Sequence, residues 1–345
     1  MSPERVTVAM SGGVDSSVAA ALLKQDGYEV SSLYMELGAD IMSNKIALED
    51  TCRMLGIPLY ELDLEEDFKR LVIDYFCLEY AGGRTPNPCV ACNKYVKFGV
   101  LLKKALEMET DYFATGHYAR TEATPGGYRL KKAVDITKDQ SYFLYTLGQK
   151  QLEHLVLPLG ELTKERVKEI AKELGLPASE HRDSQDVCFI PDNDYRAFVA
   201  EHVPQRAGEI VDINGRFLGK HEGLTGYTIG QRQGLGLASP EPLYVLKIDA
   251  ENNKIIVGSR EQALHNVLVA RNLNWVSGQS LVEPMEVTAK IRYKAPEAAA
   301  ELYPVDDGVG VRFVEPQSAV APGQSIVFYR GDELLGGGII DAVLY

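Results

Sequence analysis

The first half of the chain alternates short apolar runs with longer stretches whose apolar residues recur at the helical period. The predicted strands span 6–10, 30–35, 58–62 and 112–115. The predicted helices span 16–25, 41–55, 65–80 and 164–174. Strands that alternate with helices are typical of a parallel sheet covered on both faces. This half is therefore predicted to be an α/β domain with a doubly wound parallel sheet.

The second half has a different pattern, with frequent glycine, turn dipeptides and short β-branched runs after about Val203. Beyond about Val267, three runs alternate like strands with no helical period between them: 286–293, 310–314 and 325–329. We therefore predict three domains. The α/β domain covers residues 1–203, a small glycine-rich β domain covers 204–266, and a C-terminal β-barrel covers 267–345.

Length and composition agree with a folded protein of several domains. The chain has 345 residues, of which 45% are hydrophobic and 25% are charged, and these values exclude a disordered or fibrous chain. No run approaches the roughly 18 apolar residues that cross a bilayer. We expect a cytoplasmic protein with no membrane partner.

The net charge of −13 argues against non-specific binding along nucleic acid, which needs a large positive field. It leaves room for a local basic site. Two groups of basic residues are candidates for such a site: Lys94, Lys97, Lys103 and Lys104, and Arg129, Lys131, Lys132 and Lys138. A solvated helix face is the alternative explanation, and composition favours it.

A turn rich in glycine and serine, Ser11-Gly12-Gly13-Val14-Asp15-Ser16-Ser17, joins the first predicted strand to the first predicted helix. Backbone N–H groups converge at such a helix start, and glycines let an anion approach them closely, with the serine hydroxyls as further donors. The turn lacks the lysine of the G-x-x-x-x-G-K-[ST] loop. It resembles the loop of the adenine-nucleotide α-hydrolases, which cut ATP between its α- and β-phosphates. A serine-capped helix after a glycine turn is the alternative.

Five cysteines, an odd number in a chain without a secretory signal, are predicted to be thiols or metal ligands and not a disulfide framework. Cys89 and Cys92 follow two prolines. Cys92 is predicted to start a helix, whose dipole would lower its pKa and give a reactive thiolate. Cys188 is predicted to lie on a short strand after the last helix of the α/β domain. Cys52 and Cys77 fall in helical apolar patterns and are predicted to pack in cores.

Three thiols outside the cores leave two chemistries open. A zinc site is disfavoured, since no second Cys-x-x-Cys or His-x-x-x-His pair completes four ligands. The first remaining possibility is a persulfide relay, in which one sulfur carries the transferable atom and another releases it. The second is an iron–sulfur cluster held by three cysteines, with one open iron.

Several motifs occur in a fixed order along the chain. They are the Ser11–Ser17 loop, Thr85–Pro88, Ala114–Tyr118, Lys138–Phe143, Asp183–Ile190, Gly226–Arg232, Lys290–Tyr293 and Pro322–Gln324. In this order they resemble the motifs of the tRNA-specific 2-thiouridylases, a family of PP-loop ATP-using enzymes, and the resemblance runs nearly from end to end. It implies ATP-dependent 2-thiolation of the wobble uridine of tRNA, by adenylation of the C2 oxygen and its displacement by sulfur that cysteines deliver.

The resemblance also implies a role for each matching residue. The residues that would hold ATP, with Mg²⁺ on its phosphates, are Ala9, Met10, Ser11, Gly12, Gly13, Val14, Asp15, Ser16, Met35 and Gly116. Cys92 would be the nucleophile and Cys188 the persulfide carrier. The residues that would face the target base are Asn87, Pro88 and Cys89, and those that would contact tRNA are His117, Lys138, Asp139, Gln140, Arg292, Tyr293 and Gln324. The implied partners are tRNA and a sulfur donor protein, such as a cysteine desulfurase or a sulfur relay protein.

The chain departs from the family pattern at two places. Cys89 stands where the best-known pattern has aspartate, which strengthens the case for an iron–sulfur cluster on Cys89, Cys92 and Cys188, because thiolate is a better iron ligand than carboxylate, and leaves the relay open. The stretch 36–43 is short and lacks an aromatic residue. Two other functions remain as alternatives: a PP-loop amide synthetase acting on a small metabolite, and a non-catalytic RNA-binding protein.

Overall fold

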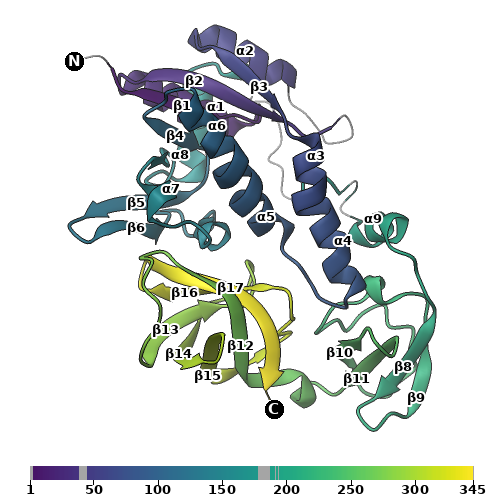
Figure 1. The fold of residues 1–345 in the computed structure, drawn as a ribbon. Coiled ribbons are helices and arrows are strands. Elements are labelled where there is room, and N and C mark those ends of the chain that lie inside the picture. The colour runs from purple at the N-terminus through teal and green to yellow at the C-terminus, as the bar shows by residue number, and fades with distance from the viewer. Residues whose placement is uncertain (1–2, 39–44, 178–186, 191, 193, 345) are drawn as a thin grey trace.

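The computed structural model describes residues 3–38, 45–177, 187–190, 192 and 194–344. Figure 1 shows an α/β part that carries the N-terminus, a β-barrel beneath it, and a small β domain at the lower right beside the barrel. Among the described residues, no helix has the length and apolar character needed to cross a membrane.

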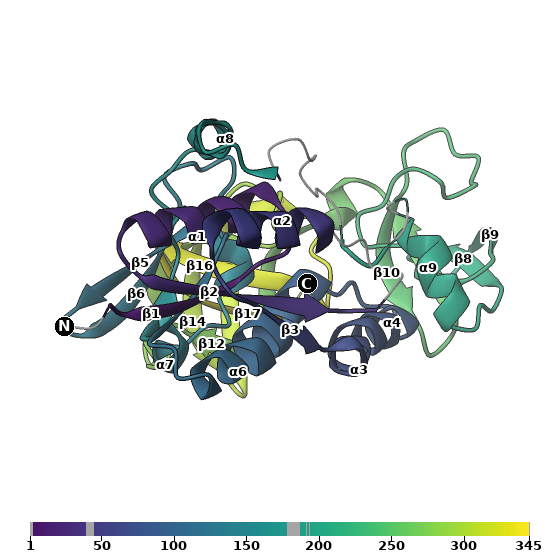
Figure 2. The ribbon, with the colours of Figure 1, turned by 90° about the horizontal axis from the view of Figure 1, so that it is seen from above.

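The α/β part is built on a five-stranded parallel sheet of order β3-β2-β1-β4-β7. Its strands are β1 (Arg5–Ala9), β2 (Glu29–Glu36), β3 (Leu59–Asp63), β4 (Tyr112–Thr115) and β7 (Leu155–Val156). Helices cover both faces: α1 (Val14–Gln25) and α2 (Lys45–Leu55) lie on one side of the sheet and α6 (Leu102–Glu107) on the other (Figure 2). The predicted doubly wound α/β fold is confirmed.

The central strands form where the sequence places uninterrupted apolar residues. Val6, Val8, Phe113 and Ala114 have no exposed surface. Burial on both faces is the environment in which a continuous apolar run becomes a parallel strand. β1 and β4 are neighbours in the sheet, and the connections that follow them lead to opposite edges. An open parallel sheet binds its ligand at such a point.

Two long helices leave the sheet toward the rest of the molecule. The first runs through α3 (Glu65–Phe68), the π-helical segment η1 (Lys69–Ile73) and α4 (Asp74–Ala81). The second runs through α5 (Pro88–Ala91), the π-helical segment η2 (Cys92–Leu101) and α6. The expected helix 65–80 is thus confirmed, although the sequence did not reveal its π-helical middle.

Among the described residues, the α/β part also contains further helical elements and a hairpin. The helical elements are η3 (Ser141–Leu144), α7 (Gln149–Leu152), α8 (Lys164–Glu173) and α9 (Tyr195–His202). The hairpin consists of β5 (Ala119–Thr124) and β6 (Gly127–Lys132). The expected helix 164–174 corresponds to α8, whereas α9 lies beyond Cys188, so that Cys188 does not follow the last helix as predicted.

The small β domain is a four-stranded sheet of order β10-β11-β8-β9. Its strands are β8 (Gly208–Asp212), β9 (Phe217–His221), β10 (Tyr244–Asp249) and β11 (Lys254–Gly258). The domain has a core cluster of its own, formed by four residues of these strands and one of the loop before β10: Ile210, Val245, Ile255, Val257 and Leu235.

The C-terminal part is a six-stranded antiparallel barrel that closes through pairing of its first and last strands. Its strands are β12 (Leu264–Trp275), β13 (Met285–Lys290), β14 (Ala298–Val305), β15 (Gly308–Ser318), β16 (Ser325–Arg330) and β17 (Glu333–Leu344). Closure leaves the barrel without exposed edges of its own and confirms the predicted β-barrel. Arg292 and Tyr293, which the sequence placed on a strand, lie in the turn after β13.

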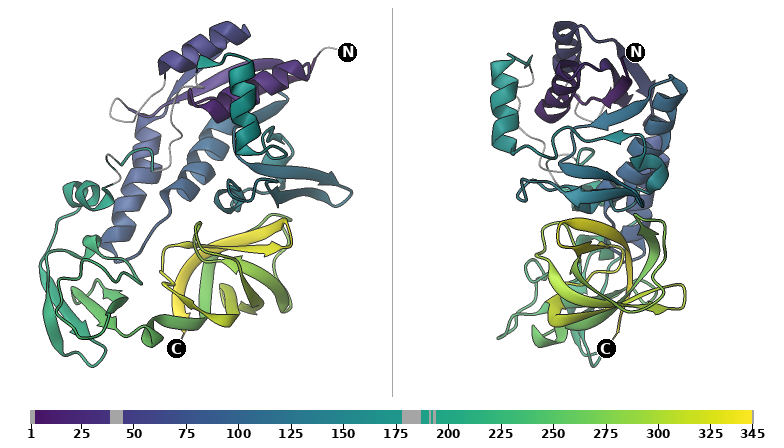
Figure 3. Two further views of the ribbon diagram at one scale, coloured as in Figure 1. Left: turned by 180° about the vertical axis from the view of Figure 1, so that it is seen from behind. Right: turned by 90° about the vertical axis from the view of Figure 1, so that its left-hand side faces the viewer.

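The hairpin of the α/β part joins the barrel by strand pairing. Leu130 and Lys131 of β6 pair with Leu334 and Glu333 of β17, and Figure 3 shows the hairpin above the barrel. Leu130 and Leu334 are buried in one core cluster that draws residues from both parts. The two parts therefore share a sheet and a core.

Candidate functional site

The loop after β1 has the conformation of an anion-binding helix start. Gly12 has a φ of +75°, and Gly13 is the N-cap of α1. The hydroxyls of Ser16 and Ser17 donate to the Gly13 carbonyl at 3.2 and 2.9 Å, and both side chains are buried. These two hydroxyls shape the turn, and their assignment as phosphate donors stays a prediction. The unpaired N–H groups of the first helical turn and the positive end of α1 remain for an anion.

A second loop lies against the first. Gly116 follows β4, and a Cβ atom at this position would come within 2.8 Å of the backbone of Asp15 and Ser16. The two loops extend from neighbouring parallel strands whose connections part to opposite edges, and an open parallel sheet binds its ligand at this crevice. Met35, half-buried near the end of β2, lies on the strand beside β1.

A lysine that the sequence did not single out lies at the loop of residues 11–17, which is the proposed phosphate loop. Lys164, the first residue of α8, donates to the two carboxylate oxygens of Asp15 at 2.8 and 2.9 Å. The Tyr118 hydroxyl donates to one of the same oxygens at 2.8 Å. Lys164 is 8% exposed. A nearly buried ammonium is thereby held at the turn where phosphate would bind, and only the fold brings it there.

The helix that carries two of the three thiols begins earlier than predicted. Asn87 caps α5 by accepting a hydrogen bond from the Val90 N–H at 3.2 Å, and Pro88 is its first residue, where the missing N–H costs nothing. Cys89 therefore lies in the first turn. Cys92, which we expected to start the helix, lies one turn inside it.

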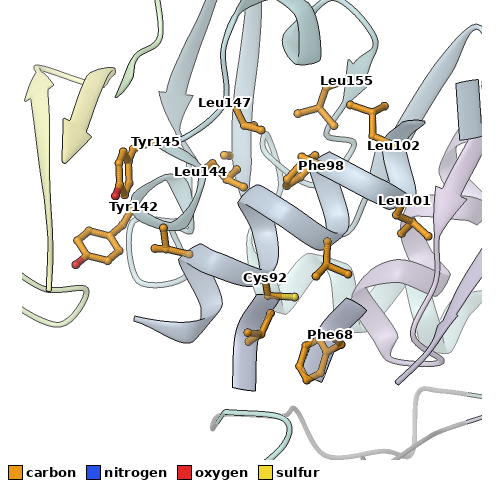
Figure 4. Close-up of a cluster of buried hydrophobic side chains, with 14 of the residues drawn as sticks. Phe68, Cys92, Phe98, Leu101, Leu102, Tyr142, Leu144, Tyr145, Leu147 and Leu155 are labelled. Carbon is orange, nitrogen blue, oxygen red and sulfur yellow. The ribbon is translucent and has the colours of Figure 1, made fainter. Parts of the chain in front are cut away.

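The three thiols differ in their access to solvent. Cys92 is 9% exposed and belongs to the main core cluster, where Figure 4 shows it near Phe68. Cys89 is half-buried, and Cys188 is exposed. Phe189, next to Cys188, packs edge-on against Phe68 with ring centroids 5.7 Å apart, which brings the Cys188 segment to this cluster. Cys188 lies in a turn and not on the predicted strand.

Burial decides the protonation of the thiols. It raises the pKa of Cys89 to about 11 and that of Cys92 to about 12. The pKa of Cys188 is also raised, because neighbouring protein atoms partly desolvate the thiol. The prediction of a lowered pKa for Cys92 was wrong, since the dipole acts at the first turn and the burial of a residue inside the helix outweighs it. The resting thiols are protonated.

Lys97 opposes this effect at all three thiols. Its positive charge lowers the pKa of Cys89, Cys92 and Cys188, although by less than burial raises it. In a π-helix the residue five positions on lies about one turn further along the same face, and Lys97 is five residues after Cys92. The sequence placed Lys97 in a basic cluster but gave no sign of this role, because the π-helical register was not visible.

His117 connects the phosphate loop with the thiol-bearing helix. It follows Gly116, is 9% exposed, and its Nδ1 lies 2.8 Å from the Thr115 hydroxyl. Its ring centroid lies 5.8 Å from that of Phe98 on η2. Burial, with a smaller effect from Lys97, holds its pKa well below the usual value, so the imidazole is neutral.

The residues expected to contact tRNA fall into two groups. Asp139 is buried, and its carboxylate accepts hydrogen bonds from the Ala133 N–H at 3.0 Å and the Ser141 hydroxyl at 2.8 Å. Gln140 accepts from the Tyr118 N–H at 2.9 Å, whereas Lys138 is half-buried at the surface. The first two therefore organise their own segment.

The second group lies at the barrel. The Arg292 guanidinium reaches the carbonyls of Ser318 and Ala319 at 3.5 and 3.4 Å. Tyr293 packs on Phe143, with ring centroids 4.4 Å apart. The side-chain amide of Gln324 donates to the carbonyls of Thr85 and Pro86.

The remaining candidates are structural or lie outside the described residues. All five cysteines are free thiols, and Cys52 and Cys77 are buried in core clusters, as predicted. Across the described part of the chain, no three His, Cys, Asp or Glu side chains come together as a ligand group for a metal. The part of the stretch 36–43 from 39 onward, and the motif residues 183–186, lie outside the described residues.

Three family models match consecutive parts of the chain. The tRNA methyl transferase HUP domain matches residues 4–192, the tRNA methyl transferase PRC-barrel domain matches residues 196–259, and the aminomethyltransferase β-barrel domain matches residues 265–340. These matches define the class: a HUP-domain protein followed by a PRC-barrel domain and a β-barrel domain.

Curated relatives narrow the class to a family. The tRNA-specific 2-thiouridylase MnmA 1 of Caldanaerobacter subterraneus subsp. tengcongensis is 49% identical, covering 98% of both chains. The tRNA-specific 2-thiouridylase MnmA of Clostridium acetobutylicum is 47% identical, covering 98% of this chain and 99% of that one. The chain belongs to the tRNA-specific 2-thiouridylase (MnmA) family.

Solved structures give a slighter likeness. The U34-tRNA thiolase NcsA from Methanococcus maripaludis with its [4Fe-4S] cluster is 20% identical and has a TM-score of 0.37, covering 59% of this chain and 66% of that one. This likeness is too slight to bear on the site.

Proposed function

We propose that this protein is an ATP-dependent tRNA-uridine 2-sulfurtransferase, which replaces the C2 oxygen of the wobble uridine of tRNA by sulfur. Full-length relatives carry the name tRNA-specific 2-thiouridylase. ATP activates the oxygen, and cysteines deliver the sulfur.

One observation carries the proposal: the phosphate loop and the thiols adjoin the same short segment. Gly116 packs on the loop at Asp15. The next residue, His117, packs on Phe98 of the thiol-bearing helix. The neighbouring Lys97 acts on all three thiols. Activation by ATP and attack by sulfur require this proximity, because both steps act on one carbon atom.

The first step is adenylation. A uridine carbonyl oxygen is a poor leaving group, so its attack on the α-phosphorus of ATP, with departure of pyrophosphate, converts it into a good one. The residues that would hold ATP are Ala9 to Ser16, with Met35 and Gly116 beside them. Mg²⁺ would neutralise the phosphates. The Asp15–Lys164 pair suits a site that binds both phosphate and Mg²⁺. The ammonium of Lys164 can face a phosphate, and the carboxylate of Asp15 can face the cation.

The second step is sulfur transfer. Exposed Cys188 is accessible to a sulfur donor protein, which would load it as a persulfide. The terminal sulfur attacks C2 and AMP leaves. Cys92 then attacks the Cys188 sulfur, the S–S bond to the transferred atom breaks, and a Cys92–Cys188 disulfide forms, which a thiol reductant must reopen. Asn87, Pro88 and Cys89 are proposed to face the base. His117, Lys138, Asp139, Gln140, Arg292, Tyr293 and Gln324 remain the proposed tRNA-side residues.

An iron–sulfur cluster fits the chemistry of Cys89, Cys92 and Cys188 but not their arrangement. Thiolates are good iron ligands. The described residues nevertheless contain no group of three such side chains gathered as ligands. We therefore favour the relay and derive no step through a cluster. Anaerobically purified protein that is colourless and fully active would agree with the relay, whereas broad absorption near about 400 nm would indicate a cluster.

The family model names a methyl transferase, but the site favours sulfur transfer over methylation. Methylation needs neither a loop for ATP phosphates nor a set of thiols beside it. The test is mass spectrometry of nucleosides from tRNA incubated with protein, ATP and a persulfide donor. We expect 2-thiouridine with the native protein and none with Cys92→Ala or Cys188→Ala. A methylated uridine, or no modification under aerobic and anaerobic conditions, would overturn the proposal.

A further inference from the structure

The turn before β16 of the barrel holds the loop that precedes the thiol-bearing helix. The side-chain amide of Gln324 donates to the carbonyls of Thr85 and Pro86 at 3.1 and 3.3 Å. In return, the Thr85 N–H donates to the Pro322 carbonyl at 2.8 Å. Three hydrogen bonds thus join segments that lie almost 240 residues apart.

Gly323 allows this close approach. Its φ is +93°, and a Cβ atom here would lie 2.9 Å from the Thr85 nitrogen and 3.0 Å from the Arg84 Cβ. Any side chain would therefore be strained and would also press on the backbone of the loop. The contact is between two backbones, which leaves little freedom in how they sit.

A second set of bonds fixes the next residue of the loop. The Tyr142 hydroxyl donates to the Ser325 carbonyl at 2.8 Å and also bonds to the side chain of Asn87. The Ser325 hydroxyl bonds to the Tyr145 hydroxyl at 3.3 Å. Figure 4 shows both tyrosines on the side of the cluster that faces the barrel strands. Asn87 is the cap of α5, so the start of the helix is tied to the barrel as well.

The loop depends on these external bonds because of its sequence. Pro86 and Pro88 have no N–H to donate, so the segment can make few backbone bonds of its own. Cys89 follows directly, and Cys92 lies one turn later. Whatever fixes the backbone at Thr85 and Pro86 therefore fixes where the helix begins and where both thiols lie.

We propose that the turn 322–325 of the barrel, with Gln324 as its key side chain, is a positioning element that sets the place of Cys89 and Cys92. Gln324 is then a positioning residue, which acts on Cys89 and Cys92 through the loop backbone, and this role is separate from the tRNA contact proposed above for the same residue. The consequence for catalysis rests on the proposed sulfur transfer, but the positioning itself does not. It also explains why a barrel far along the chain belongs to the active unit.

The test uses thiol reactivity in the full-length protein without tRNA or ATP. Gln324→Met keeps the size of the side chain and removes its N–H donors. Gln317→Met is the matched control, since the Gln317 amide donates to the Glu315 carbonyl of its own strand and, among the described residues, makes no bond to the thiol-bearing helix or the loop before it. Iodoacetamide labelling of Cys89 and Cys92 is followed by peptide mass spectrometry. We expect Gln324→Met to speed labelling at least about threefold, because a loosened loop opens more often, with Gln317→Met unchanged.

A second pair of variants changes the same contact by steric means. Gly323→Ala adds the clashing Cβ, whereas Gly278→Ala adds one at a barrel glycine with φ +77° and no atom within 4 Å. Both strain the backbone, but only the first presses on the loop. We expect faster labelling with Gly323→Ala alone. The thermal midpoint of each variant shows whether the fold is intact.

Turnover separates positioning from tRNA contact. We expect Gln324→Met to lower kcat at saturating tRNA about tenfold, as misplaced reacting groups do, whatever the change in the Kd for tRNA. Unchanged labelling of Cys89 and Cys92 together with a raised Kd for tRNA would overturn the proposal. Changed labelling in a protein that forms no 2-thiouridine would instead preserve the positioning role and refute the proposed function.

Discussion

Lys164 holds both carboxylate oxygens of Asp15, at 2.8 and 2.9 Å, directly behind the first turn of the phosphate loop. The ammonium is almost buried, whereas the carboxylate is about a third exposed. Lys164 therefore places a positive charge beside a loop whose own sequence has no lysine, and we propose that this charge stabilises the phosphates of ATP.

Loss of this charge should slow adenylation. We expect Lys164→Ala to lower the rate of tRNA-dependent pyrophosphate release by about 100-fold, the usual effect of removing a group that stabilises developing charge. Lys172→Ala, on the same helix but away from the loop, is the control. A Lys164→Ala variant with the native rate would show that the loop backbone alone stabilises the phosphates.

The raised pKa values of the thiols predict a marked pH dependence. Cys89 and Cys92 titrate at about 11 and about 12, so the reactive thiolate is scarce at neutral pH and grows about tenfold with each pH unit. The labelling rate of Cys92 by iodoacetamide should rise accordingly between neutral and alkaline pH. A plateau reached below pH 9 would contradict the burial argument.

Removing the charge of Lys97 should shift the pH dependence of thiol labelling to higher pH. Its charge lowers the pKa of the thiols, so Lys97→Met should raise the pKa and reduce labelling at every pH below it. Lys94→Met is the matched control, because the ammonium of exposed Lys94 lies over the Tyr95 ring, 4.9 Å from its centroid. If the two variants showed the same dependence of labelling on pH, Lys97 would have no effect on the pKa of the thiols, which would contradict this prediction.

The thiols differ in burial, and this difference predicts which of them are alkylated first. Cys188 is exposed, whereas Cys92, Cys52 and Cys77 are each less than a tenth exposed. Limited alkylation of the native protein should modify Cys188 first, and Cys52 and Cys77 only after unfolding. Peptide mass spectrometry at increasing times measures this order. Early loss of Cys77 would contradict the described packing.

The shared core of hairpin and barrel predicts a large effect far from the site. Leu130 has no exposed surface and pairs with Leu334 of β17. Leu130→Ala should lower the free energy of unfolding by about 2–5 kcal/mol, from lost burial and the cavity left behind. Val134→Ala, at a position 49% exposed, should change it by less than about 0.5 kcal/mol. Urea unfolding of both variants measures the difference.

Local sequence was sufficient for the parallel sheet and the phosphate loop. The runs around Val6, Val8 and Phe113 are apolar without interruption, and the glycines of the loop follow the first of them. Each signal lies within a few residues, so no knowledge of tertiary contacts was needed. Alternating runs beyond Val267 likewise indicated the barrel.

Contacts between distant segments could not be predicted. Asp15 and Lys164 are 149 residues apart, and nothing at either position indicates the other. The hydrogen bonds from Gln324 to the loop before the thiol-bearing helix also join segments far apart in the sequence. The pKa shift of Cys92 was predicted in the wrong direction. A helix start, and hence its dipole, can be predicted from local sequence, whereas the burial of Cys92 depends on its packing with Phe68 and the rest of the core cluster.

The fate of the displaced oxygen tests the account most directly. A tRNA carrying ¹⁸O at C2 of the wobble uridine would be incubated with the protein, ATP and a persulfide donor, and the products analysed by mass spectrometry. The account predicts one 2-thiouridine for each AMP, with the ¹⁸O in that AMP. Appearance of the label in inorganic phosphate or water, or of 2-thiouridine without ATP, would contradict it.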